Sequence, residues 1–154
     1  YGFEGMVHEP PKFFDDVNEV IFNTSWMIDK NYDSLTHIIE QRKDRFPANM
    51  REQNPYTLAR KLYDAIDYAV AIAQRNYKYI VPIYYPKFDR ISFLMPIFLD
   101  GTYNTSPDFA LVLQTDAENK IYITRTILDL ETGYQDARLV AKPDESWLNP
   151  VTLK

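Results

Sequence analysis

A single arginine inside an apolar run is the first residue of this sequence whose position suggests chemistry. Residues 120–128 alternate as a strand does, which predicts that Arg125 shares a face with Ile121, Ile123 and Ile127. An arginine in such a row must reach solvent, pair with an acid or face a cleft. Its planar guanidinium suits a phosphate or carboxylate, and the neighbouring Thr126 belongs to the same candidate site.

Three polar residues follow this strand at helical spacing. Glu131, Tyr134 and Arg138 stand at positions i, i+3 and i+7, so a helix would place them on one face. Arg125 and Arg138 would then hold a phosphate or carboxylate, while Tyr134 would stack on a base or donate a hydrogen bond. The structural alternative is an arginine–carboxylate pair that fixes this helix to the sheet.

A second candidate is a group of aromatic residues between a predicted helix and the strands that follow. It comprises Asn76, Tyr77 and Tyr84, together with Tyr79 and Tyr85. Aromatic rings on an exposed sheet face stack single-stranded bases in several RNA-binding modules. The alternative is that these rings fill the seam between helix and sheet.

A small basic cluster, Arg42, Lys43 and Arg45, is predicted at the end of a helix. Cations at that position complement the helix dipole, so a solvated helix end is the simplest interpretation. A contact with phosphate is the functional alternative.

The sequence offers no pattern typical of a metal or cofactor site. Asp15, Asp16 and Glu19 lack a partnered histidine, and the two histidines, His8 and His37, are far apart. Four glycines in the whole chain are too few for a glycine-rich phosphate loop or dinucleotide fingerprint. We therefore expect neither a metal nor a cofactor.

Composition sets the broad class. A chain of 154 residues with 45% hydrophobic residues suits one domain with its own core. It has no cysteine and no apolar run of the roughly 20 residues needed to cross a bilayer, which favours a cytoplasmic protein without membrane contact. The formal net charge of -5 argues against strong nucleic-acid binding that depends on phosphate contacts alone.

Hydrophobic periodicity predicts helices in the first half of the chain. We expect an amphipathic helix over residues 11–22, a connection over 23–33, and a helix capped by Asp33 or Ser34 that ends at Phe46. A longer helix should cover residues 55–75, with Asn54 as its cap and Pro55 as its first residue. The positions expected to face the core are Leu35, Ile38, Ile39, Leu58, Leu62, Ala65, Ile66, Ala69, Ile72 and Ala73.

The second half is rich in Ile, Val, Tyr and Phe, which predicts four strands with hairpin-like connections. Their ranges are 78–85, 90–99, 109–114 and 120–128. Pro82 and Pro96 fall inside two of them, which indicates edges or bulges. A short helix over 131–140 and an extended tail over 143–153 complete the chain. The predicted fold is α+β, with N-terminal helices packed on a four-stranded, mainly antiparallel sheet and a short C-terminal helix.

Short motifs distributed between residues 34 and 148 resemble a bacterial family known as domain of unknown function 3825. The motifs are His37-Ile38-Ile39-Glu40, Arg45-Phe46-Pro47, Arg75-Asn76-Tyr77-Lys78, Val81-Pro82, Tyr84-Tyr85-Pro86, Leu94-Met95-Pro96, Ala110-Leu111-Val112, Arg125-Thr126-Ile127-Leu128, Tyr134, Ala137-Arg138-Leu139, Pro143-Asp144 and Ser146-Trp147-Leu148. By this resemblance the family domain is longer at its N-terminus than this chain. Its members sit beside cold-shock-type or OST-HTH (LOTUS-type) domains, which implies RNA-linked work within a longer protein and a neighbouring domain upstream.

Three functional hypotheses remain open from the sequence. The first is a noncatalytic accessory module that binds single-stranded RNA, a nucleotide or another ligand. The second is an enzyme acting on nucleotides or phosphorylated nucleic-acid ends, with Arg125 and Arg138 on the phosphate and Tyr134 or Glu131 as proton carriers. The third is a scaffold for protein contact or dimerisation, and the sequence leaves the oligomeric state undecided.

Overall fold

The computed structural model of this chain describes residues 21–85, 90–100 and 106–138. In chain order its helices and strands are β1 (Met27–Asp29), α1 (Tyr32–Gln41), α2 (Pro55–Ala73), β2 (Val81–Tyr85), β3 (Arg90–Ile97), β4 (Phe109–Asp116), β5 (Ile121–Leu128) and α3 (Leu130–Arg138). Two short 3-10 turns, Lys43–Arg45 and Ala48–Met50, connect α1 to α2.

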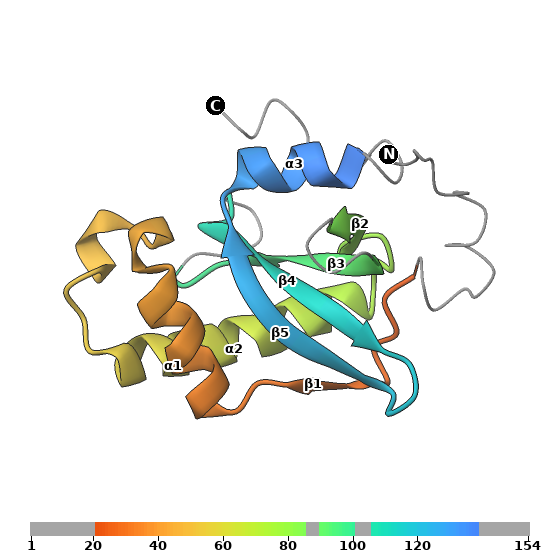
Figure 1. The fold of residues 1–154 in the computed structure, drawn as a ribbon, viewed down its shortest axis with the longest axis horizontal. Helices are drawn as coiled ribbons and strands as arrows, with labels where there is room; N and C mark the ends of the chain where they lie inside the picture. The colour runs from red at the N-terminus through yellow and green to blue at the C-terminus, as the bar shows by residue number, and fades with distance from the viewer. Residues whose placement is uncertain (1–20, 86–89, 101–105, 139–154) are drawn as a thin grey trace.

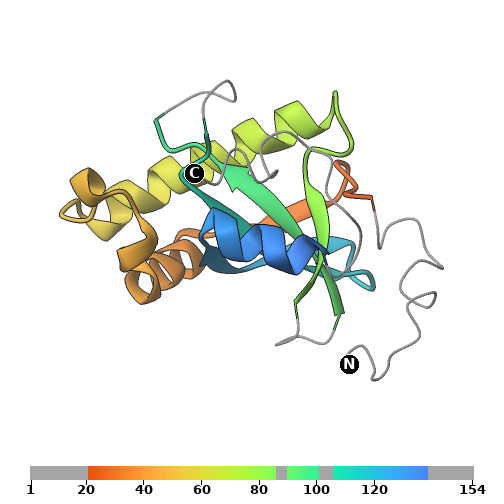
Figure 2. The ribbon, with the colours of Figure 1, turned by 90° about the horizontal axis from the view of Figure 1, so that it is seen from above.

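The strands form one mixed sheet with the order β1-β5-β4-β3-β2. β1 runs parallel to β5, and the other neighbouring pairs are antiparallel. α1 and α2 lie against one face of the sheet, and α3 lies against the other (Figure 1, Figure 2). The predicted α+β class is confirmed, but the sheet described has five strands instead of four.

The additional strand, β1, lies within residues 23–33, which we expected to be only a connection. Three residues are too few to show the alternation by which a strand is recognised in a sequence. Their strand geometry comes from the partner, since Met27 pairs with Ile121 and Asp29 pairs with Ile123. The hydroxyl of Thr124 adds a hydrogen bond to the carbonyl oxygen of Asp29 at 3.1 Å.

The start of α1 differs from its prediction. Asn31 is the cap, because its side-chain oxygen accepts a hydrogen bond from the backbone N–H of Ser34 at 2.8 Å. Asp33 and Ser34, the predicted caps, therefore lie inside the first turn. The helix ends at Gln41 instead of Phe46, because the 3-10 turns replace its last part. The predicted core positions Leu35, Ile38 and Ile39 are buried.

α2 follows its prediction closely. Asn54 accepts a hydrogen bond from the backbone N–H of Tyr56 at 2.7 Å, and Pro55 is the first helical residue. The helix ends at Ala73, two residues before the predicted boundary. Small side chains at Ala65, Ala69 and Ala73 are buried, which lets neighbouring elements approach this helix closely.

Strand register assigns the apolar side chains to the two faces of the sheet. Phe109 packs edge-on against Phe46, with ring centroids 4.9 Å apart, on the face that α1 and α2 cover. Leu94 points to the other face, because a Cβ atom added to Gly133 of α3 would lie 2.8 Å from its Cδ2 atom. The sheet is thus covered on both faces, which agrees with the nearly continuous apolar sequence of β3.

The two strand prolines occupy positions where a missing N–H is tolerated. Pro82 belongs to β2, the terminal strand of the described sheet. Pro96 lies beyond Leu94, the last β3 residue that pairs with β2, so no strand of the described sheet pairs with that side of β3 at Pro96. Both placements agree with the predicted edge positions.

Tyr122 joins the segment before β1 to the core. Its ring stacks on Phe22 with centroids 4.5 Å apart and lies 5.2 Å from the ring of Trp26. Its hydroxyl oxygen accepts a hydrogen bond from the backbone N–H of Asn23 at 2.8 Å. This tyrosine is fully buried, so its polar end needs that partner.

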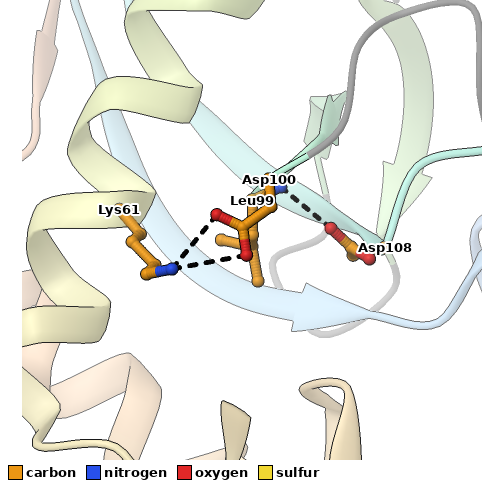
Figure 3. Close-up of polar contacts among 4 residues, drawn as sticks. All are labelled: Lys61, Leu99, Asp100 and Asp108. Atoms are coloured by element: carbon orange, nitrogen blue, oxygen red, sulfur yellow. Dashed lines mark hydrogen bonds and ion pairs between the residues drawn. The ribbon is translucent and has the colours of Figure 1, made fainter. Parts of the chain in front are cut away.

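Polar contacts hold the ends of the connection between β3 and β4 (Figure 3). Lys61 of α2 contacts both carboxylate oxygens of Asp100, at 3.1 and 3.3 Å. The carboxylate of Asp108 accepts a hydrogen bond from the backbone N–H of Leu99 at 2.8 Å. The Lys61–Asp100 pair is largely exposed, so we assign it less than about 1 kcal/mol of stability.

Several predictions fall outside the described residues. Most of the helix expected over residues 11–22 lies outside them, and its last two residues, Ile21 and Phe22, are described but are not helical. The connection over residues 86–89 and the tail over 143–153 also lie outside the described residues. The C-terminal helix expected over 131–140 begins one residue earlier, at Leu130, and its last two predicted residues are not described.

The contact between Gly133 and Leu94 yields a stability prediction. Replacing Gly133 with Ala favours the helix by about 1 kcal/mol but forces a methyl group onto Leu94, which costs about 1–3 kcal/mol. We expect Gly133→Ala to be neutral or destabilising in the natural sequence, and stabilising once Leu94→Val has removed the obstructing Cδ2 atom. Urea unfolding of the two single variants and the double variant measures this coupling. Additive effects would show that α3 does not approach β3 as described.

Tyr122 yields a pH prediction. Burial raises the pKa of Tyr122 to about 12, although the hydrogen bond from Asn23 acts in the opposite direction. An unfolded chain loses this proton near pH 10. The unfolded state therefore ionises first, and we expect the free energy of unfolding to fall between about pH 10 and 12, by roughly 1.4 kcal/mol per unit of pKa difference.

Urea unfolding over this pH range, with Tyr122→Phe as the control, checks that expectation. The variant leaves the N–H of Asn23 without its acceptor, so we expect it to be about 1 kcal/mol less stable at neutral pH. Its stability should decline less steeply between about pH 10 and 12. An equal decline in both proteins would assign the alkaline sensitivity to another group.

Candidate functional site

Arg125 occupies an irregular position in β5. Thr124 pairs with Leu113 and Thr126 pairs with the adjacent Val112, so Arg125 is an extra residue that opposes no residue of β4. This arrangement is a β-bulge, a feature that re-aims side chains and is frequent beside functional sites. The sheet therefore presents Arg125 in a way that a regular strand would not.

The side chain of Arg125 is exposed and is oriented by β4. Its Nε–H donates a hydrogen bond to the side-chain oxygen of Gln114, which faces the same side of the sheet as Ile123. The prediction that Arg125 shares a face with Ile127 is wrong, because Ile127 pairs with Leu111 on the opposite face. The bulge is the physical reason, since one inserted residue shifts the alternation of all that follow.

Thr126 belongs to the edge of the sheet. Its hydroxyl oxygen accepts a hydrogen bond from Nε of Arg42 at 3.3 Å, and a guanidinium nitrogen of Arg45 donates to the carbonyl oxygen of Ile127. Arg42 and Arg45 of the predicted basic cluster thus make hydrogen bonds along the edge of β5, at residues that β1 does not pair with. This contact with β5 differs from both predicted roles of the cluster, a phosphate contact and a solvated helix end.

α3 begins next to the bulged strand because Asp129 caps it. The carboxylate of Asp129 accepts a hydrogen bond from the backbone N–H of Thr132 at 2.8 Å, and its carbonyl oxygen accepts one from Gly133. The predicted site residues of this helix differ in setting. Glu131 is exposed and Tyr134 is partly buried against the core. Arg138 is the last described residue of the helix, and the structure describes only its backbone.

The predicted aromatic group is divided between surface and core. The side-chain oxygen of Asn76 accepts a hydrogen bond from the backbone N–H of Lys78 at 3.1 Å, forming the turn from α2 towards β2. Tyr77 is 57% exposed, whereas Tyr79 is buried. Tyr84 lies in β2 opposite Ile91. Tyr77 and Tyr79 therefore do not form a single exposed stacking surface.

Sequence reasoning missed two polar residues that lie in register with Arg125. Ser92 of β3 pairs directly with Gln114 of β4, and both are buried on the face that α3 covers. Ser92 is 0% exposed, and its hydroxyl has no hydrogen-bond partner within the part of the chain that the structure describes. The available signal was one serine within the otherwise apolar second strand. Ser92, Gln114 and Arg125 form what we call the polar row.

A second charged cluster joins the segment after β1 to α2. Lys30 lies 2.9 Å from the carboxylate of Asp67 and 4.1 Å from the ring centroid of Tyr63. Burial opposes the charged form of Lys30, but hydrogen bonds and charge interactions with Asp67 and Tyr63 outweigh it and raise the pKa of Lys30 above its ordinary value. Its contacts are those of a structural ion pair.

Within residues 21–85, 90–100 and 106–138, no group of three His, Cys, Asp or Glu side chains could hold a metal ion. No helix in these ranges is long and apolar enough to cross a membrane. His37 is exposed on α1, while His8, Asp15, Asp16 and Glu19 lie outside the described residues.

Two buried hydroxyls on nearby strands should respond to mutation with opposite signs. Ser92→Ala removes a hydroxyl that lacks a partner, so we expect the free energy of unfolding to rise by about 1 kcal/mol. Thr124→Val removes a buried hydroxyl that donates a hydrogen bond to the carbonyl oxygen of Asp29. In this variant we expect the free energy of unfolding to fall by about 1 kcal/mol. Urea unfolding of the unliganded variants measures both changes. A clear loss of stability in Ser92→Ala would mean that this hydroxyl has a structural partner, such as a buried water.

Comparison with known protein families matches residues 4–147 to a family described as Domain of unknown function (DUF3825). The match covers nearly the whole chain and begins well before residue 34, where the sequence motifs start. No curated protein matches the chain, and no solved structure matches it. By the extent of this match, the chain belongs to the family of domains of unknown function DUF3825.

Proposed function

We propose that this domain is a noncatalytic accessory module that binds a phosphate group of single-stranded RNA or of a nucleotide through Arg125. The proposal places it in a bacterial multidomain protein that acts in the cytoplasm. Its main support is one observation: Arg125 is an exposed residue on a β-bulge, and Gln114 holds its Nε.

Such a guanidinium suits phosphate recognition. Arginine carries its N–H donors in a planar fork that matches the geometry of a phosphate, and the contact with Gln114 is made at Nε. Fixing Nε orients the plane of the guanidinium, so less side-chain freedom is lost when an anion binds. The helix that carries Glu131, Tyr134 and Arg138 lies over the same face of the sheet, where it packs on Leu94.

The charge of the chain sets the expected form of binding. A formal net charge of -5 disfavours long-range attraction of a polyanion, so the affinity has to come from local contacts. We therefore expect weak binding that decreases with salt, with a shallow dependence that reflects few phosphate contacts.

Fluorescence anisotropy of a labelled single-stranded RNA tests the proposal, at low and at physiological salt. We expect Arg125→Gln to weaken binding by about 10- to 100-fold, the effect of losing a hydrogen bond between charged groups. Arg60→Gln is the matched control, since it removes the same charge from an exposed position on α2, against the opposite face of the sheet.

Two outcomes would count against this function. Equal losses in the two variants would indicate a general charge effect without a site at Arg125. Absence of binding at low salt, for RNA and for nucleotides alike, would remove the proposal altogether. Binding of nucleotides without RNA would identify the ligand as a small molecule.

A further inference from the structure

The outer side of β1 is an open edge of the described sheet. β1 is a terminal strand and lies at the lower margin of the molecule in Figure 1, and no strand of the described chain pairs with its outer side. An edge strand offers N–H and C=O groups to another chain, and proteins often block such pairing with lysine or proline. β1 contains neither residue, and its first side chain, Met27, is 74% exposed.

The hydrogen bond from Thr124 shows which backbone groups of β1 face outward. Its hydroxyl donates to the carbonyl oxygen of Asp29 at 3.1 Å, so that carbonyl points towards β5. Successive residues of a strand direct their N–H and C=O groups to opposite edges. The backbone groups of Met27 therefore also face β5, whereas the N–H and C=O of Ile28 point outward. One residue thus presents both the donor and the acceptor that a further strand requires.

A second copy of β1 satisfies this donor and acceptor by symmetry. Where two antiparallel strands meet at Ile28 of both copies, each N–H donates to the other C=O. The two neighbouring registers are less suitable. A shift towards Asp29 would place two carboxylates opposite each other. A shift towards Met27 would require the N–H of Trp26, which already donates to the carbonyl oxygen of Asn23 at 3.2 Å.

The register centred on Ile28 is also complementary in its side chains. It places Met27 of each copy opposite Asp29 of the other, in the type of pair where side chains lie closest. No two like charges face each other within the paired residues. Because the arrangement is two-fold symmetric, this contact occurs twice, and a change at Met27 acts twice on each dimer.

The helices leave room for this pairing. The two-fold axis would be perpendicular to the sheet, so both copies would carry α1 and α2 on the same side. α1 packs over β5, and β5 and its counterpart would be three strand spacings apart, about 14 Å. Packed helices are separated by about 8–10 Å. α1 and its counterpart therefore fit side by side.

We propose that the outer edge of β1 is a dimerisation surface, at which a second copy of this chain adds its own β1 antiparallel and extends the sheet. This interaction is independent of the proposed phosphate site. Only three residues of each chain form the paired strand, so we expect a weak dimer with a dissociation constant between about 10 µM and about 1 mM. The formal net charge of -5 on each copy opposes association, and salt screens that repulsion.

Sedimentation velocity of the 154-residue chain, from about 10 µM to about 1 mM at physiological salt, tests the proposal. We expect a dimer whose population rises with concentration. Met27→Asp would introduce two like-charge pairs and should weaken the dimer about tenfold, whereas Met27→Lys would create two attractive pairs with Asp29 and should strengthen it about fivefold. Tyr56→Asp and Tyr56→Lys are the matched controls, because Tyr56 is 67% exposed and lies in α2, outside β1.

The sign of the response to charge is decisive. A monomer throughout the concentration range would overturn the proposal. Equal weakening by Met27→Asp and Met27→Lys would mean that Met27 opposes itself, which would overturn the register centred on Ile28. A dimer that changes equally in the Met27 and Tyr56 variants would use another surface and would also overturn the proposal.

Amide hydrogen exchange supplies a second readout at the paired edge. The N–H of Ile28 should exchange more slowly as the dimer population rises, because it gains an acceptor on the second copy. Exchange at Ile28 that does not depend on protein concentration would contradict the proposal. Thermal unfolding verifies that each variant is folded, and the exposure of Met27 leads us to expect melting temperatures close to that of the natural protein.

Discussion

The backbone N–H and C=O groups along both edges of β5 need hydrogen-bond partners, and the elements around this strand supply them. One edge pairs with β4, but β1 covers the other only from Ile121 to Ile123. Beyond that point side chains reach the edge, where Arg45 donates to the carbonyl oxygen of Ile127. Buried backbone groups without partners are strongly destabilising, so this edge fixes both β1 and the turns that follow α1.

The same strand contains the irregularity on which the candidate site depends. With Arg125 inserted between two paired residues, β5 directs this arginine towards Gln114 and still buries Ile127 on the opposite face. A regular strand would have placed both side chains on one face. The bulge therefore reconciles a continuous apolar core with a charged group in the middle of a sheet.

The polar row and the helix above it make the two faces of the sheet chemically different. On the face of α1 and α2, aromatic rings such as Phe46, Phe93 and Phe109 fill the interior. On the face of α3, Ser92 and Gln114 interrupt an apolar surface, and Gly133 lets the helix approach Leu94. The family description names no activity, so the case for function rests on this local chemistry.

Elements with strong local signals could be located before the fold was known. Periodicity and capping located α2 at Asn54 and Pro55, and β-branched and aromatic runs located β2 to β5. The sequence also showed that Arg125 is unusual in an apolar strand. Strand pairing in the folded chain is what makes Met27–Asp29 a strand, turns Ile127 away from Arg125 and brings Ser92 into register with Gln114. These features depend on which distant strands pair and in what register, and no short stretch of sequence carries that information.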